Sequence, residues 1–107
     1  MAAAVSMEGN VTVSDDGSWS YTWMWTCAGD DSVAAVHEEF LIKNDSGMVD
    51  SVTESTHSAD PGQTYLGGGN GNNHIPPGQT YWSLRVLGGD GYLGEANGNF
   101  FAATAPP

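Results

Sequence analysis

The segment WSYTWMWTC, residues 19–27, decides the fold of this chain. Its aromatic side chains occupy every second position from 19 to 25 and alternate with smaller or polar residues. Only a β-strand turns every second side chain to one face, so this period predicts a strand with an aromatic face. We expect that face to lie in the core, and it comprises Trp19, Tyr21, Trp23, Trp25 and Cys27.

The residues before this strand predict its hairpin partner. Val11 and Val13 also alternate with other residues, and the sequence DDGS at 15–18 separates the two runs. An Asp-Gly pair favours a tight turn because glycine accepts a positive φ without strain. The sequence therefore predicts a β-hairpin that turns at 15–18.

Residues 33–43 fit two interpretations. A helix would start behind Ser32 as its N-cap and would bury Val33, Val36, His37, Phe40 and Leu41. A strand would turn inward Ala34, Val36, Phe40 and Ile42, with Glu38 as a misfit on the same face. We favour the strand, because the turn sequence NDSG at 44–47 leads into a segment rich in Val, Ser and Thr at 48–56, which is typical of a second hairpin arm.

The last third of the chain repeats one short sequence. PGQTY occurs at 61–65 and again at 77–81, and we interpret it as one turn-into-strand solution used twice. The glycine- and asparagine-rich segment 67–73 between the copies has no side chain able to anchor a core, so we expect a mobile surface loop there. Two further strands are expected, one with the inward residues Trp82, Leu84 and Val86 and a last one at Phe100, Phe101, Ala102 and Ala103.

These elements predict an all-β protein, an immunoglobulin-like antiparallel β-sandwich of about seven strands that forms a single domain over residues 1–107. Residues 75–107 resemble the second half of a fibronectin type III or related immunoglobulin-like domain. Ile75, Pro77 and Tyr81 match the spacing of that family's tyrosine corner, in which the tyrosine hydroxyl ties a loop to the sandwich. The apolar residues after Tyr81 fall at odd offsets where the family has even ones, so either a bulge shifts the register or Tyr81 is not a corner tyrosine.

Charge and composition exclude several classes of protein. Thirteen acidic residues against two basic ones, Lys43 and Arg85, give a net charge of −11, which repels nucleic-acid backbones. No apolar run approaches the length of a membrane span, and no signal peptide is visible, so we expect a soluble chain. The single cysteine, Cys27, excludes an internal disulfide.

The sequence predicts neither a catalytic site nor a metal or cofactor site. Cys27 is expected on the core face, where a thiol is an inert apolar group. His37, His57 and His74 lie in separate segments without zinc-ligand spacing. Acidic residues at the turns could gather around calcium, but Asp also caps turn amides by itself, and we favour that role for the pairs at 15–16 and 30–31 and for Asp90.

Two function classes remain. The first is a non-enzymatic structural or adhesive module that docks on a protein assembly, most specifically a capsid decoration or tail-associated protein on a virion or other extracellular particle surface, where acidity limits aggregation. The alternative is a carbohydrate-binding accessory module of a secreted system. A sugar site needs exposed aromatic rings and nearby polar side chains, and the candidate interaction residues are Tyr65, Gly69, Asn70, Asn72, Asn73, Asp90 and Tyr92.

Overall fold

The computed structural model describes residues 2–54, 56–89 and 91–102. These residues form eight β-strands and no helix. The strands are β1 (Ala3–Val13), β2 (Trp19–Ala28), β3 (Val33–Asn44), β4 (Gly47–Thr53), β5 (His57–Ala59), β6 (Thr64–Asn70), β7 (Gly78–Gly88) and β8 (Gly91–Ala102). Within this part of the chain, no helical segment has the length and hydropathy needed to cross a bilayer.

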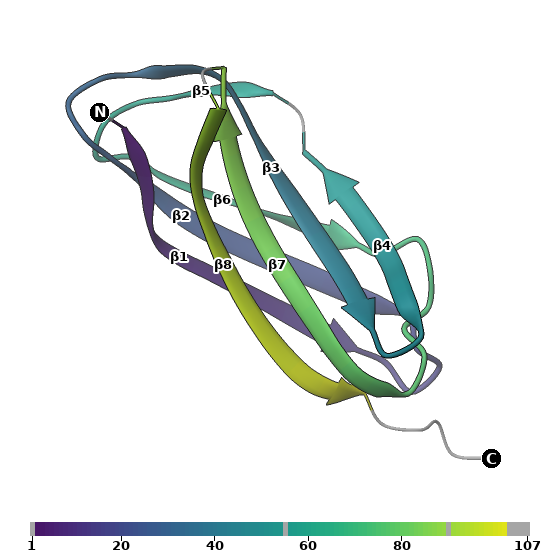
Figure 1. Ribbon diagram of the computed structural model, residues 1–107. Helices are drawn as coiled ribbons and strands as arrows, with labels where there is room; N and C mark the ends of the chain where they lie inside the picture. The colour runs from purple at the N-terminus through teal and green to yellow at the C-terminus, as the bar shows by residue number, and fades with distance from the viewer. Residues whose placement is uncertain (1, 55, 90, 103–107) are drawn as a thin grey trace.

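Two antiparallel sheets pack face to face and form an immunoglobulin-like β-sandwich, as the sequence predicts (Figure 1). One sheet has three strands in the order β1-β2-β6. The other has five, in the order β4-β3-β7-β8, with the short β5 paired to the beginning of β3. The molecule is elongated, with extents of 53 × 20 × 20 Å, and the strands run along its length.

The predicted first hairpin is confirmed. Strands β1 and β2 pair antiparallel, with Val13 opposite Trp19 at the turn. Gly17 has a φ of 89°, a backbone conformation that favours glycine, and this is the role expected of the Asp-Gly sequence. The aromatic face of β2 points inward, and its residues Trp19, Tyr21, Trp23, Trp25 and Cys27 are all buried.

Residues 33–44 form a strand, which confirms the interpretation we favoured over a helix. Its inner face differs from the prediction at Ala34, which is exposed. A bulge between Val33 and Val36, with Ala35 at a φ of 55°, separates Ala34 from the inward residues that follow. Glu38, the expected misfit, occupies an inner position and is only 1% exposed.

The mobile loop expected at 67–73 requires correction, because Gly67 to Asn70 belong to strand β6 and pair with β2. Gly67 lies against the indole ring of Trp23, and a Cβ atom added to it would approach that ring to 2.2 Å. Gly71 lies against Trp19 in the same way, at 1.9 Å. Both glycines therefore leave room for the large rings of β2, and at Gly67 the lack of a side chain marks a packed strand rather than a loop.

Both PGQTY copies lead into a strand, but the two strands present opposite faces. Tyr65 is partly buried against the core, whereas Tyr81 is 41% exposed on the outside of β7. The pairing of β7 with β3 runs without a shift through Tyr81. No bulge shifts the register at this point, so Tyr81 is not a corner tyrosine. This explains why the apolar residues after Tyr81 differ in spacing from those of a fibronectin type III domain.

Aromatic stacking joins the two sheets. Phe40 of β3 stacks on Tyr21 of β2 with ring centroids 4.7 Å apart, and it stacks on Trp82 of β7 at 5.6 Å. Leu84 and Val86 continue the inner face of β7 and are fully buried, while Trp82 is partly buried between Gly9 and Gly98. The core thus lies on the side of β7 opposite to Tyr81.

Candidate functional site

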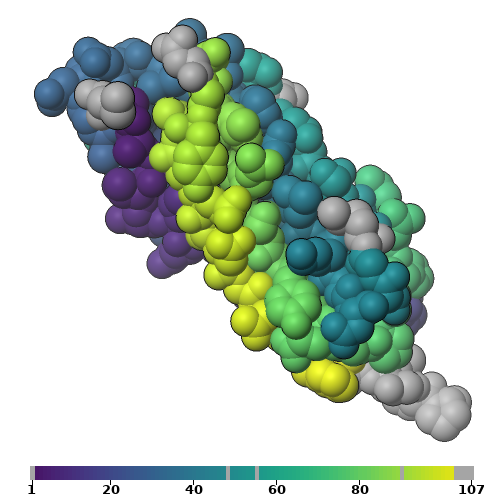
Figure 2. Space-filling view, in the orientation of Figure 1, coloured from purple at the N-terminus to yellow at the C-terminus, as the bar shows by residue number. Residues whose placement is uncertain are grey.

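The outer face of the five-stranded sheet carries a set of polar side chains around one exposed tyrosine. Figure 2 looks onto this face, where β8, β7 and β3 run side by side. Alternation and antiparallel register place outward-facing residues of these three strands in cross-strand rows. The rows are Lys43, Tyr81 and Asn99; Leu41, Ser83 and Asn97; and Glu39, Arg85 and Glu95.

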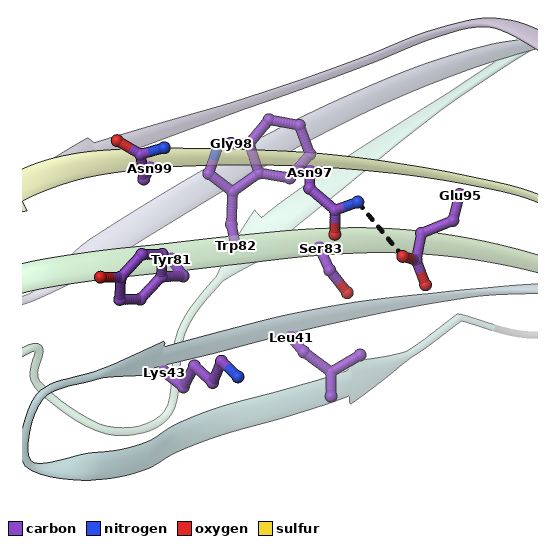
Figure 3. Close-up of a pocket in the computed structure, with 9 residues that line it drawn as sticks. All are labelled: Leu41, Lys43, Tyr81, Trp82, Ser83, Glu95, Asn97, Gly98 and Asn99. Atoms are coloured by element: carbon purple, nitrogen blue, oxygen red, sulfur yellow. Dashed lines mark hydrogen bonds between the residues drawn. The ribbon is translucent and has the colours of Figure 1, made fainter.

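A shallow cavity of about 490 Å³ lies on this face. Lys43 and Leu41 reach it from β3, and Tyr81 and Ser83 from β7 (Figure 3). Strand β8 contributes a carboxylate and amides, and its lining residues are Glu95, Asn97, Gly98 and Asn99. The site therefore combines an exposed aromatic ring with hydrogen-bonding groups and one lysine. We call these lining residues the outer-face site.

Hydrogen bonds and ion pairs hold the polar groups at one end of the outer-face site. Arg85 lies between two carboxylates, with Nη1 3.6 Å from Glu39 Oε1 and Nε 3.4 Å from Glu95 Oε1. Asn97 Nδ2 donates to Glu95 Oε2 at 3.2 Å, the contact drawn in Figure 3. These contacts order the side chains before any ligand arrives, which lowers the entropy cost of binding.

A second aromatic residue extends the same face. Phe101 is 71% exposed and lies opposite Gln79 across the β7–β8 pair. Gln79 Nε2 in turn donates to Asn99 Oδ1 at 3.3 Å. Exposed aromatic rings and side-chain amides therefore continue from the cavity toward the end of β8.

A different cluster of charged groups lies between the two sheets. Glu38 Oε2 accepts a hydrogen bond of 2.8 Å from Trp25 Nε1 and lies 2.7 Å from His57 Nε2. Its other oxygen, Oε1, is buried without a hydrogen-bond partner. The ring of Tyr65 covers this group, with its centroid 5.0 Å from that of Trp25 and 5.1 Å from that of His57.

The titration of His57 reflects this environment. Burial acts to lower the pKa of His57, but the Ser58 carbonyl and the Glu38 carboxylate outweigh it, and the pKa is raised. Nδ1 lies 2.9 Å from the Ser58 oxygen while Nε2 faces Glu38, so both ring nitrogens meet acceptors. Only the imidazolium form can donate to both, and this geometry favours it.

One further carboxylate and a backbone carbonyl accept hydrogen bonds from the remaining polar side-chain groups of the aromatic stripe. Glu54 Oε1 accepts from Tyr21 Oη at 3.0 Å and from Trp23 Nε1 at 3.5 Å. Burial and this hydrogen bond raise the pKa of Tyr21 to about 12. Trp19 Nε1 donates to the Asn73 carbonyl at 2.7 Å. The Glu54 carboxylate therefore supports the fold, because its Oε1 accepts hydrogen bonds from two core side chains.

The predicted interaction residues do not come together. Tyr65 packs inward against Trp25, and Gly69 and Asn70 pair with β2. The backbone N–H groups of Asn72 and Asn73 donate to Asp50 Oδ2 at 2.7 and 3.3 Å, which ties down the segment after β6.

Two candidates remain. Asp90 lies outside the described residues, and Tyr92 is the second residue of β8. Tyr92 is 60% exposed and lines a separate cavity of about 580 Å³. Gly89 N, which follows β7, donates to Ala34 O at the start of β3. The segment after β6, which holds Asn72 and Asn73, lies at the other end of the sandwich (Figure 1). The described members of the predicted set therefore do not form one site.

Sequence reasoning missed the outer-face site. One signal was available in β8, where Glu95, Asn97 and Asn99 occupy every second position, as expected of a polar face. Lys43 and Ser83 gave no such signal by themselves, because only the register of β3 and β7 places them beside that row. Within the described residues, no three His, Cys, Asp or Glu side chains are placed to hold a metal ion.

Solved structures share this fold at low sequence identity. The C-terminal domain of Wzt matches with a TM-score of 0.69 and 10% identity, over 99% of this chain and 74% of that one. A candidate β-galactosidase from Bacteroides fragilis matches with a TM-score of 0.64 and 17% identity over 90% of this chain. A β-glucuronidase from Bacteroides uniformis matches with a TM-score of 0.61 and 10% identity over 92%.

This chain spans only 16% and 13% of the two enzyme chains. No family model and no curated protein sequence matches it. At these identities the likenesses establish the β-sandwich fold alone, and they assign no activity to this chain.

Proposed function

We propose that this chain is a non-catalytic glycan-binding module and that its sugar site is the outer-face site. The observation that carries this proposal is the exposed ring of Tyr81 above a cavity bordered by amide, hydroxyl and amino side chains. A sugar ring has apolar C–H faces that can lie against an aromatic ring, and its hydroxyls need donors and acceptors around the edge. Asn97, Asn99 and Ser83 supply such groups in a fixed array.

The rigidity of the platform supports the same function. Tyr81 lies on β7, which is paired on both sides, by β3 and by β8. A binding residue on a central strand keeps its position better than one on a loop. The neighbours also favour this proposal over the particle-surface one, since the fold occurs as a minor part of chains named as a β-galactosidase and a β-glucuronidase. Docking on a capsid or tail receives no such support and stays a prediction.

A comparison of two exposed tyrosines tests the proposal. Tyr81→Ala removes an exposed tyrosine ring from the outer-face site, whereas Tyr92→Ala removes an even more exposed tyrosine ring from the other cavity. A glycan microarray, followed by affinity electrophoresis in gels that contain the polysaccharides bound, measures both variants against the wild type. We expect Tyr81→Ala to weaken binding at least tenfold and Tyr92→Ala to bind like the wild type.

Thermal melting of both variants separates loss of binding from loss of fold. Both side chains are exposed, so each substitution is expected to change the free energy of unfolding by no more than about 1 kcal/mol. Unchanged glycan binding by Tyr81→Ala, or failure of the wild type to bind any glycan, would contradict the proposal.

A further inference from the structure

We infer that the outer-face site prefers a sugar that carries a negatively charged group, and that Lys43 is the residue that recognises this charge. The inference rests on the proposed glycan-binding function and adds a ligand class to it. Its basis is the placement of the chain's two cations, together with the different ways in which their charges are compensated.

Both basic side chains of the chain lie on this one face. The sequence has two basic and thirteen acidic residues, and Lys43 and Arg85 project from neighbouring strands, β3 and β7. Solubility does not require this arrangement, because the net charge of −11 already keeps the molecule away from neutrality. The outer face of the five-stranded sheet is therefore the part of the described surface where a local positive charge can act on a ligand.

The two cations differ in their partners. Arg85 is held between the carboxylates of Glu39 and Glu95, so its charge is compensated within the protein. Lys43 makes no ion pair with any described residue, and its cross-strand neighbour is the uncharged Tyr81. Directly opposed side chains on adjacent strands have Cβ atoms about 5 Å apart. The amino group of Lys43 is thus exposed beside the aromatic platform and free to meet an anion.

The carboxylate that lines the cavity does not cancel this charge. Glu95 is occupied by Arg85 and by Asn97 Nδ2 and lies two cross-strand rows away from Lys43. Asp45 follows Lys43 by two residues, but neither it nor any other described carboxylate forms an ion pair with Lys43, and salt screens charges beyond about 8 Å at physiological ionic strength. At contact distance a sugar over Tyr81 therefore meets a cation, although the whole protein is anionic.

The ligand chemistry follows from this geometry. A sugar ring stacked on Tyr81 would bring an exocyclic carboxylate or sulfate within reach of Lys43, while its hydroxyls face Asn99 and Ser83. A lysine amino group is a point charge with three donors, so it suits either type of anion. The shared chemistry is an anionic substituent on the sugar, carried either by a uronic acid or by a sulfated sugar.

Paired polymers test the inference and identify the source of the charge. Isothermal titration with oligogalacturonate is compared with its methyl ester, and titration with dextran sulfate is compared with dextran. The proteins are the wild type, Lys43→Gln, Lys43→Arg and Tyr81→Ala. We expect the wild type to bind the acidic member of one pair about tenfold more tightly than the neutral member, as for one charged hydrogen bond.

The variants separate this inference from the proposed function. Lys43→Gln should lose that preference and bind the two members of a pair with similar affinity, Lys43→Arg should keep the preference, and Tyr81→Ala should weaken binding of both members. Equal binding of both members by the wild type, or a preference that survives in Lys43→Gln, would overturn the inference while Tyr81-dependent binding stands. Absence of binding to every polymer, or binding that Tyr81→Ala leaves intact, would remove the proposed function and the inference together.

Discussion

The indole Nε1 of Trp25 donates a hydrogen bond of 2.8 Å to Glu38 Oε2, a carboxylate that is 1% exposed and lies between the two sheets. This hydrogen bond offsets the free-energy cost of burying both groups, because a buried N–H and a buried carboxylate each need a hydrogen-bond partner. His57 completes the group from the short strand β5. One acidic residue therefore links β2, β3 and β5.

Removal of this carboxylate should destabilise the whole domain. Glu38→Ala leaves the Trp25 N–H and the His57 ring without their acceptor and opens a cavity, so we expect a loss of about 3–5 kcal/mol in the free energy of unfolding. Glu38→Gln keeps an acceptor for Trp25 and should cost less. Urea unfolding followed by tryptophan fluorescence measures both, and the exposed Glu8→Ala serves as the control. Equal stabilities of Glu38→Ala and Glu8→Ala would refute this role of Glu38.

The His57–Glu38 pair should make stability depend on pH in a defined direction. The folded pKa of His57 is raised, so its stabilising effect is fully present below the unfolded pKa of about 6.5 and is lost as the pH rises through the folded value. The difference in melting temperature between wild type and His57→Gln should therefore be largest near pH 5.5–6 and shrink toward pH 9. His74→Gln, on the exposed segment after β6, is the matched histidine control. A difference that stays constant or grows as the pH rises would contradict the prediction.

Two glycines on the same strand should respond differently to one added methyl group. Gly67→Ala forces a Cβ to within 2.2 Å of the Trp23 ring, and we expect a cost of about 1–3 kcal/mol from overpacking. At Gly69 the added Cβ would lie 3.4 Å from its nearest atom, the Tyr21 hydroxyl, and should be tolerated better. Chemical denaturation compares the two variants.

A double-mutant cycle tests whether the Trp23 ring causes the cost at Gly67. Trp23→Ala alone should cost about 3–5 kcal/mol, because it removes a large buried side chain. Gly67→Ala added to that variant should cost much less than in the wild type, since the ring that it meets is gone. Additive costs would show that the strain at Gly67 arises elsewhere.

The single cysteine should be unreactive in the folded protein. Cys27 is buried, and burial, followed by the charge of Asp60, raises the pKa of its thiol. Reaction with a disulfide reagent such as DTNB should therefore be slow in buffer at pH 8 and fast in urea. Thr22→Cys in a Cys27→Ser background places a thiol on the exposed face of the same strand and should react at once. Rapid labelling of native Cys27 would place the thiol at the surface.

The sequence predicts the parts of this fold whose side chains carry a local period. The aromatic alternation of β2 and the Asp-Gly turn depend on neighbouring residues only, so the first hairpin follows from the sequence. Strand β6 carries no such pattern, because the Trp23 ring on β2 leaves no room for a side chain at Gly67. Glu38 likewise looks misplaced until Trp25 and His57 are brought to it.

The outer-face site escaped prediction for a related reason. Its rows join the β7–β8 hairpin to β3, which is far from that hairpin in sequence, so one residue of register decides whether Tyr81 joins Lys43 or faces the core. The expected sites were instead sought in loops, where Asn72 and Asn73 turned out to bind the domain's own Asp50. Polar residues in a glycine-rich segment can serve the fold as readily as a ligand.

The packing of glycines against indole rings distinguishes the positions of this domain that tolerate substitution from those that do not. Gly9 and Gly98 enclose Trp82, and Gly67 lies against Trp23. A few large rings therefore fill these parts of the core, and the glycines beside them have no side chain that could be made smaller. The outward positions next to them, such as Asn97 and Asn99, are exposed. Substitutions on one surface can therefore change what the domain contacts while the interior stays fixed, which makes the domain a suitable framework for selecting new binding specificities.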